Sequence, residues 1–264
     1  MDIFEEIVAA KKINQPLVMA TVIQSLGSAP RGEGARMLVR SDGTISGTIG
    51  GGAVEQKIIE EAMKLFSGGA ARLVAYELKD IGMECGGGMS VFLEPLVPAP
   101  QLVIFGAGHI GTCLAQMGKM LEFTVTAVDN RPEFANADRL PWADSILAED
   151  YLAAIDKIVF TELTYIIILT HKHAHDYVIL EKCLEKKWCY LGMIGSKVKV
   201  ATIIKQLEEK GVSEEMIKKI HAPVGIHIGA NTPAEIAISI LAEIVQIRSA
   251  HTAAPRMDTC ASLK

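Results

Sequence analysis

One stretch constrains the fold of this chain more than any other, the segment QLVIFGAGHIG from Gln101 to Gly111. A short apolar run, Leu102 to Phe105, is typical of a strand, and three glycines follow it with the spacing G-x-G-x-x-G. The first glycine, Gly106, permits a tight turn, and the second, Gly108, lets the backbone approach a pyrophosphate. The third lets a helix pack close to the strand. The pattern therefore predicts a strand, a phosphate-binding turn and a helix, in that order.

A second apolar strand supports this interpretation. The run Phe123 to Val128 ends at Asp129, 18 residues after Gly111, close to the spacing of a ribose-binding carboxylate. A carboxylate at this place accepts hydrogen bonds from ribose hydroxyls and repels a 2′-phosphate, so we expect NAD or another unphosphorylated nucleotide in preference to NADP. Arg131 weakens the preference because it is close enough to hold a phosphate. The alternative is a glycine-rich turn that serves packing alone.

Composition narrows the class of protein. The chain has 264 residues, of which 50% are hydrophobic and 5% aromatic, which suits an aliphatic-rich α/β protein with two domains. A net charge of −5 without any basic run argues against a nucleic-acid partner. The acidic N-terminus is unlike a signal peptide, and no apolar run reaches the length of a membrane span. Five cysteines without a C-x-x-C pair suit a reducing compartment, so we expect a cytoplasmic protein.

Two segments of the N-terminal part are candidate anion sites. The loop SLGSAPRGEGAR carries Arg31 and Arg36, which can clamp an anion through paired hydrogen bonds or can simply be solvated. Further on, three consecutive glycines from Gly50 run into a helix expected to begin near Ala53. Unpaired N–H groups and the positive end of the helix dipole would then face one place. Close packing is the alternative role for these glycines.

Cys85 lies in the loop KDIGMECGGGMS, directly before three glycines. A thiol beside exposed amides can be stabilised as a thiolate, which binds soft metals. Most lone cysteines are small buried hydrophobes, but a glycine loop offers little apolar cover. We therefore expect a functional role for Cys85, as a metal ligand or a sulfur carrier.

The run THKHAHD follows a β-branched strand, Tyr165 to Leu169. His171, His173 and His175 alternate, and alternate residues of an extended chain point the same way, as metal ligands often do. The carboxyl end of a parallel strand also borders the ligand-binding crevice of an α/β sheet. We therefore expect a ligand-binding or catalytic contact in preference to a metal site, with a solvated loop as the alternative. The segment GMIGSKVK forms a similar strand end, with a lysine available for phosphate.

The proline-bearing segment PLVPAPQ predicts a stiff domain boundary. We expect an N-terminal α+β domain over residues 1–97, a parallel-sheet domain over 98–248 and a frayed tail over 249–264. In the second domain, the pattern T-P-A-E from Thr232 predicts the start of a long last helix.

Together these motifs resemble those of the XdhC/CoxI family, accessory proteins that bind molybdenum cofactor and deliver it to xanthine dehydrogenase-type hydroxylases. The likeness covers nearly the whole chain. It rests on GSAPRGEGARMLV at 27–39, DGTISGTIGGGAVE at 42–55, CGGGM at 85–89, FGAGHIG at 105–111, VDNRPE at 128–133, THKHAHD at 170–176, LGMIGSKVK at 191–199 and APVGIHIGANTPAEIAISILAEI at 222–244. Two departures affect the site. Family members often carry cysteine where this chain has Ala53, so Cys85 would act alone here. Lys172 also replaces an acidic or amide residue of the histidine motif.

The resemblance implies an α/β fold with an N-terminal α+β domain followed by a Rossmann-like parallel-sheet domain. It implies a chaperone whose glycine loops and arginines hold the pterin phosphate while Cys85 faces the metal and the sulfido ligand is installed. The expected partners are a xanthine dehydrogenase-type hydroxylase and a cysteine desulfurase; the oligomeric state is not determined, a homodimer being one option. The candidate cofactor-binding residues are Arg31, Arg36, Gly50, Gly51, Gly52, Glu55, Cys85, Gly86, Gly87, Gly106, Gly108, His109, Gly111, Asp129, His171, His173, Ser196 and Lys197, with Cys85 also the metal ligand.

Two other functions fit parts of the sequence. One is an NAD-dependent oxidoreductase with His171 or His173 as acid or base beside the Gly106 turn. The other is a non-catalytic nucleotide sensor. An oxidoreductase has no evident need for Cys85, so we expect an accessory protein in preference to a turnover enzyme. The Gly106 turn would also accept the pyrophosphate of a dinucleotide form of the molybdenum cofactor, which would let one ligand bridge both domains.

Overall fold

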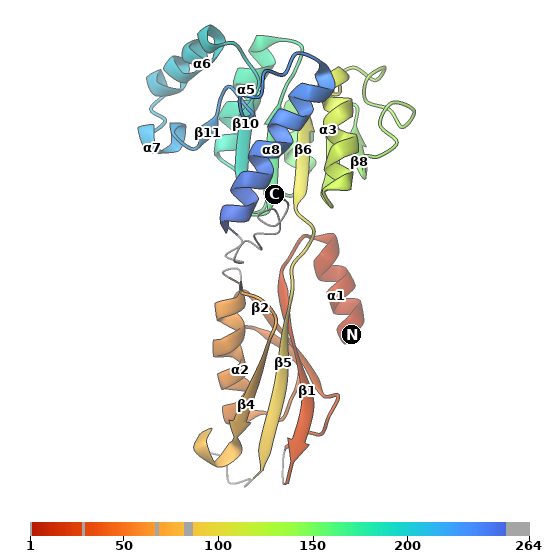
Figure 1. Ribbon diagram of the computed structural model, residues 1–264, viewed down its shortest axis with the longest axis vertical. Coiled ribbons are helices and arrows are strands. Elements are labelled where there is room, and N and C mark those ends of the chain that lie inside the picture. The colour runs from red at the N-terminus through yellow and green to blue at the C-terminus, as the bar shows by residue number, and fades with distance from the viewer. Residues whose placement is uncertain (1, 28–29, 67–68, 82–86, 252–264) are drawn as a thin grey trace, which may run out of the picture. The chain divides into compact units, whose positions relative to one another are not determined.

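The structure, a computed structural model, describes residues 2–251 except 28–29, 67–68 and 82–86. The described chain divides into two compact units, one ending at Pro98 and the other spanning Ala99–Ala250. The N-terminal unit holds an antiparallel sheet and the C-terminal unit a parallel sheet (Figure 1). This confirms the mixed α/β fold with a Rossmann-like second unit that the sequence predicts.

The described part of the N-terminal unit forms a five-stranded sheet in the order β3-β2-β1-β5-β4, with every neighbouring pair antiparallel. Its elements are α1 (Ile3–Lys12), β1 (Leu17–Leu26), β2 (Arg36–Arg40), β3 (Ile45–Gly47), α2 (Gly52–Leu65), β4 (Arg72–Glu77), the 3-10 helix η1 (Leu78–Ile81) and β5 (Gly88–Leu96). The period-two alternation of β1 directs Val18 and Ala20 towards the apolar face of α2, while Leu17 and Met19 pack with α1 on the other side. One helix therefore covers each face.

Strand β5 is longer than the sequence predicts, since we expect a strand over Val91 to Leu93 alone. It continues through Pro95, which lies opposite Val18 of β1. Pairing with β4 stops at Leu93, so one side of β5 is open at the proline, the kind of edge position that proline tolerates.

The described part of the C-terminal unit forms a six-stranded, all-parallel sheet in the order β11-β10-β9-β6-β7-β8. Its strands are β6 (Gln101–Phe105), β7 (Thr124–Val128), β8 (Ser145–Leu147), β9 (Thr164–Ile168), β10 (Tyr190–Met193) and β11 (Ile220–His221). The chain begins in the middle at β6, builds β7 and β8 on one side, and returns to β9 on the other. Ligands of open α/β sheets bind outside the carboxyl ends of the strands at such a reversal.

Helices cover both faces of this sheet (Figure 1). They are α3 (His109–Met120), α4 (Tyr151–Lys157), α5 (His173–Leu184), α6 (Lys197–Glu209), α7 (Glu214–Ile217) and α8 (Pro233–His251). Leu102 and Ile104 of β6 pack with α3 and α8, whereas Val103 and Phe105 pack with α4, α5 and α6. The central strands are thus buried on both faces, which explains their unbroken apolar sequences.

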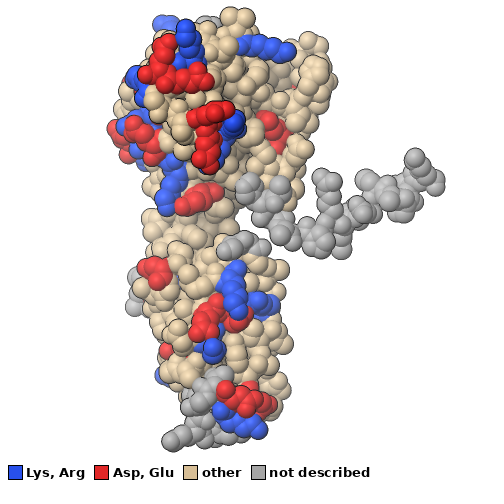
Figure 2. Space-filling view, turned by 90° about the vertical axis from the view of Figure 1, so that its left-hand side faces the viewer, with Lys and Arg blue, Asp and Glu red and all other residues tan. Residues whose placement is uncertain are grey.

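The last helix begins where the sequence predicts. The Glu235 amide donates to Thr232 Oγ1 at 3.3 Å, and the Thr232 amide donates to Glu235 Oε2 at 2.9 Å, a reciprocal cap. Among the described helices, none is long and apolar enough to cross a lipid bilayer. Figure 2 shows Lys and Arg interspersed with Asp and Glu on the face it presents, with no broad field of one sign among the described residues there.

Candidate functional site

The glycine turn after β6 lies where the strand order reverses. A Cβ at Gly106, whose φ is 115°, would lie 2.3 Å from the carbonyl oxygen of Leu169 at the end of β9. A Cβ at Gly111 would lie 2.0 Å from the carbonyl oxygen of Gly106. Around Gly108, by contrast, a Cβ would meet nothing within 4 Å. The outer glycines therefore serve close packing, and the middle one borders open space.

The space beside Gly108 adjoins the start of α3. Gly108 is the N-cap of this helix and supplies no capping side chain, so the first-turn amides lack the partner that a serine or aspartate would provide. His109 is the first residue of α3 and is exposed. This arrangement suits an anionic group of a ligand.

Asp129 follows β7 and is fully buried. Its carboxylate accepts the Ala107 amide of the glycine turn at 2.9 Å and the Arg131 guanidinium through Nε and Nη2, each at 2.9 Å. Burial alone would raise the pKa of Asp129, but these hydrogen bonds outweigh it and hold that pKa below its usual value. The expected ribose-binding carboxylate is therefore engaged within the protein, and its role towards a ribose stays a prediction.

The run of histidines is partly helical, whereas the sequence predicts an extended chain. We expect a helix from Tyr177, but α5 begins at His173, so His173 and His175 lie in its first turn. Successive helical residues are rotated by about 100°, so residues two apart do not share a face, and the extended-chain argument is wrong for this pair. The described residues contain no group of His, Cys, Asp or Glu arranged to hold a metal. The side chain of His173 lies outside the described part of the structure.

Two of the histidines lie near each other after the carboxyl end of β9. The His175 ring centroid is 5.8 Å from that of His171 and 5.3 Å from that of Tyr151. His171 is exposed, and its pKa is lowered, first by partial burial and then by the positive charge of Arg131. A neutral imidazole at this exposed position can accept or donate a hydrogen bond.

Lys199 is a residue of this region that the sequence motifs do not indicate. Its ammonium donates to the buried carboxylate of Asp176 and, at 2.9 Å, to the Ile194 carbonyl. Asp176 also accepts the hydroxyl of Thr170 at 2.7 Å and its amide at 3.1 Å. This network ties the ends of β9 and β10 together. The signal that could have found it is Asp176 itself, a carboxylate at the start of a helix that packs on the sheet.

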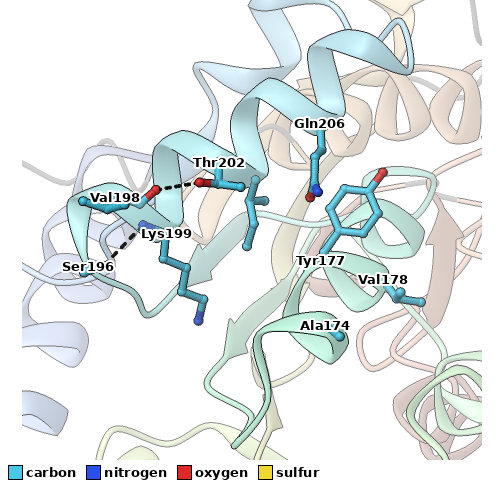
Figure 3. Close-up of a pocket in the computed structure, with 9 residues that line it drawn as sticks. Ala174, Tyr177, Val178, Ser196, Val198, Lys199, Thr202 and Gln206 are labelled. Carbon is cyan, nitrogen blue, oxygen red and sulfur yellow. Dashed lines mark hydrogen bonds between the residues drawn. The ribbon is translucent and has the colours of Figure 1, made fainter.

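The predicted pair beside Lys199 is placed differently. Ser196 is the N-cap of α6 and its hydroxyl accepts the Lys199 amide at 3.3 Å, while Lys197 is exposed. A cavity of about 630 Å³ lies between α5 and α6 (Figure 3). Tyr177 and Gln206 lie on opposite walls of it. Ser196 lines this cavity and Lys197 does not, and contact of either residue with phosphate stays a prediction.

The N-terminal glycine loop brings two distant motifs together. A Cβ at Gly50 would lie 2.4 Å from Pro30 Cγ and 3.7 Å from the Arg31 amide nitrogen, so the arginine-bearing loop packs directly on the glycines. Arg31 is exposed there and has no ion-pair partner among the described residues. Arg36 lies over Phe4 of α1 instead, with Cζ 5.4 Å from the ring centroid.

Glu55 of α2 holds the shape of this loop. Its Oε1 accepts the Thr48 hydroxyl at 2.6 Å, the Gly51 amide at 2.9 Å and the Ile49 amide at 3.3 Å. Burial opposes ionisation, but these bonds outweigh it and lower the pKa of Glu55. Part of the predicted anion cradle is therefore already filled by the protein. Gly51 is the N-cap of α2 and adds no capping side chain, and Gly52, the first residue of that helix, is exposed.

Cys85 and Gly86 lie outside the described residues. Gly87 is described, and its carbonyl accepts the Leu78 amide at 2.9 Å, just before β5 begins. The role of Cys85 as metal ligand or sulfur carrier stays a prediction.

Comparison with known families decides the affiliation. The family model described as XdhC Rossmann domain matches residues 102–244, and the one described as XdhC and CoxI family matches residues 10–77. The chain belongs to the XdhC and CoxI family. The two matches fall on the parallel-sheet unit and on the antiparallel unit, respectively. The family that the motifs resemble is thus confirmed.

Several known proteins are similar to this chain, over different shares of their own length. Uncharacterized protein YqeB of Escherichia coli (strain K12) is 42% identical over 258 residues, 94% of this chain and 47% of YqeB. The chain thus spans about half of that relative. Molybdenum cofactor insertion chaperone PaoD of the same organism is 28% identical, covering 88% of this chain and 83% of PaoD. A crystal structure described as a xanthine dehydrogenase from Bacillus halodurans has a TM-score of 0.54 and 25% identity, covering 97% and 98% of the two chains.

Proposed function

We propose that this chain is a molybdenum cofactor insertion chaperone that serves a xanthine dehydrogenase-type hydroxylase. The observation that supports this most is membership of the XdhC and CoxI family together with likeness to PaoD over 83% of its length. The description of the related crystal structure as a xanthine dehydrogenase supports a partner of that type. In this proposal the protein acts as an accessory factor, and the cofactor is its cargo.

The N-terminal glycine loop would hold the pterin phosphate of the cargo. Arg31 is an exposed cation packed beside Gly50, and the start of α2 lacks a capping side chain at Gly51. A guanidinium and uncapped amides are the groups that hold phosphate in proteins. Glu55 would keep the loop in shape, and Cys85 would face the metal while a cysteine desulfurase supplies the sulfido ligand.

The experiment is transfer of cofactor to an apo-hydroxylase. Protein carrying Cys85→Ser should bind less molybdenum, measured by elemental analysis after purification from a cofactor-producing host, and should activate the apo-hydroxylase less. Arg31→Ala should weaken binding by about 1.5–3 kcal/mol if the guanidinium holds the phosphate, because a charge-assisted hydrogen bond is lost.

The matched controls are Cys113→Ser in α3 and Arg40→Gln, whose guanidinium pairs with Glu6, and both should leave molybdenum content unchanged. Normal activation by Cys85→Ser would remove the thiol from the proposal. Absence of molybdenum from the unaltered protein would contradict the cargo itself.

A second candidate is a nucleotide function of the parallel-sheet unit, as an NAD-dependent oxidoreductase or a sensor. The observation that favours it is the glycine turn at the strand reversal, with open space beside Gly108. Oxidation of NADH by the purified chain with an added carbonyl compound, which would accept the hydride while His171 or His173 supplies the proton, would select the oxidoreductase. Binding without turnover would select the sensor.

A further inference from the structure

The carboxylate of Asp129, which the sequence predicts to bind an unphosphorylated ribose, has all its acceptor sites occupied. Asp129 Oδ1 accepts the Arg131 amide at 3.1 Å and Arg131 Nε at 2.9 Å, while Oδ2 accepts Ala107 N and Arg131 Nη2, each at 2.9 Å. A carboxylate offers about four acceptor sites, and all four are used here. A ribose hydroxyl can bind Asp129 only after Arg131 moves away. The buried charge of Asp129 would then lack its ion-pair partner.

Arg131 belongs to a pair of guanidinium groups. Its Cζ lies 3.8 Å from the ring centroid of Phe134, and Arg139 Cζ lies 4.8 Å from the same centroid. Arg139 forms no ion pair with the described residues, and its Nε is buried without a hydrogen-bond partner there. Two guanidinium groups thus lie against one ring, and the donors of Arg139 and those of Arg131 that Asp129 does not use are of the kind that binds phosphate.

Other buried polar atoms at this edge of the sheet also lack partners. They are Asn130 Oδ1 and the hydroxyl of Tyr151, a residue only 2% exposed. The Tyr151 ring lies between Phe105 and His175, with centroids 6.3 and 5.3 Å away, which places it at the carboxyl end of β6. Burial, followed by the charge of Asp129, raises the pKa of Tyr151 to about 12, so its hydroxyl stays protonated and able to donate. Unpartnered buried groups are uncommon and mark a place for a ligand.

The local charge favours a more anionic ligand than plain ribose. Asp129 and Arg131 neutralise each other, and Arg139 and the uncapped start of α3 add positive charge. Glu133 and Asp138, the acids of the same loop, are exposed to solvent. We propose that Arg131 and Arg139 select a nucleotide whose ribose carries a phosphomonoester, bound beyond the carboxyl ends of β6 and β7.

This ligand class goes beyond cofactor insertion. The sequence alone predicts a preference for NAD over NADP, which depends on a free carboxylate at Asp129. The saturated carboxylate and the two guanidinium groups support the reverse order. Two natural sources carry such a phosphate, at the 2′-position in NADP and at the 3′-position in coenzyme A.

The test is calorimetric titration of the full chain with 5′-AMP, 2′,5′-ADP and 3′,5′-ADP. A bisphosphate should bind at least about tenfold more tightly than 5′-AMP, as expected for one or more charge-assisted hydrogen bonds. Tighter binding of 2′,5′-ADP would identify an NADP-type ligand, and tighter binding of 3′,5′-ADP a coenzyme A-type ligand. Equal dissociation constants for all three would overturn the proposal.

The variants separate recognition from folding. Arg139→Gln should reduce the difference between bisphosphate and 5′-AMP, and the double variant Asp129→Asn with Arg131→Gln should reduce it without leaving a buried charge unpaired. Arg40→Gln, which removes an arginine that binds Glu6 in the other unit, should leave the difference unchanged. If the double variant keeps the full difference, Arg131 does not read the phosphate. These titrations involve no molybdenum, so their outcome is separate from that of the cofactor-transfer experiment.

Discussion

The two glycine turns are built on the same plan and differ in charge and packing. Each leads into a helix whose N-cap is a glycine, Gly51 in α2 and Gly108 in α3. In each, a carboxylate of the protein accepts an amide of the turn. Glu55 comes from the helix that follows and has no ion-pair partner among the described residues. Asp129 comes from the end of the next strand and is paired with Arg131.

This difference bears on which anion each turn can accept. At the N-terminal turn an incoming anion would meet the charge of Glu55, which has no ion-pair partner among the described residues, so in the proposed function Arg31 would provide the attraction. At the C-terminal turn the carboxylate is already neutralised, and further positive charge is nearby. The same backbone motif is thus completed by different side chains, and under the two proposals above the turns would differ in the anion that each accepts.

The largest expected effect tests the packing side of the comparison. Gly111→Ala should lower the free energy of unfolding by about 3 kcal/mol or more, because its Cβ would lie 2.0 Å from a backbone oxygen that cannot move aside. Gly51→Ala should cost about 1–2 kcal/mol, from its φ of 75° alone, since nothing lies within 4 Å of the added carbon. Urea unfolding of both variants measures the difference. Equal losses would contradict the contrast between the closely packed Gly111 and the open Gly51.

A smaller effect tests the ion pair. Asp129→Asn should lower the free energy of unfolding by about 2–3 kcal/mol, less than for a fully buried pair because Arg131 is 26% exposed. The matched control is Asp144→Asn. The Asp144 carboxylate likewise pairs with a cation, Lys119, and accepts a backbone amide, but its side chain is 40% exposed. We expect about 1 kcal/mol or less there. Thermal or urea unfolding that ranks Asp144→Asn above Asp129→Asn would count against the structural role assigned to Asp129.

The smallest effect concerns Glu55 and pH. Glu55→Gln should cost about 1 kcal/mol at neutral pH, because an amide oxygen still accepts but carries no charge. The folded-state pKa of Glu55 is lowered, so its stabilisation is present above the unfolded-state value of about 4.3 and is lost as the pH falls through the folded value. The unaltered protein and the variant should therefore converge in stability under acid, whereas Glu60→Gln on the exposed side of α2 should track the unaltered protein throughout. A gap that stays constant from neutral to acid pH would show that the charge of Glu55 is not what stabilises the loop.

Several features were predictable because they depend on neighbours in sequence. The G-x-G-x-x-G spacing, the apolar strand before it and the T-P-A-E cap are local patterns, and the turn after β6 and the start of α8 follow them. The start of α5 was not predictable in the same way. The helix begins at His173, and its apolar residues follow the helical period only weakly. Asp176 of this helix is buried and accepts the Thr170 amide that follows β9, a contact that depends on the tertiary fold.

The amino-acid sequence by itself determined the two-part α/β fold, the glycine turns and the family. Only the tertiary structure decided which atoms meet the charged groups: Asp129 reaches back to Ala107, Asp176 binds Lys199, and Pro30 packs on Gly50. The physical reason is range. Backbone preferences and periodicity act over a few residues, whereas the partner of a buried carboxylate depends on strand order and on which loops the packed sheet brings to the same edge.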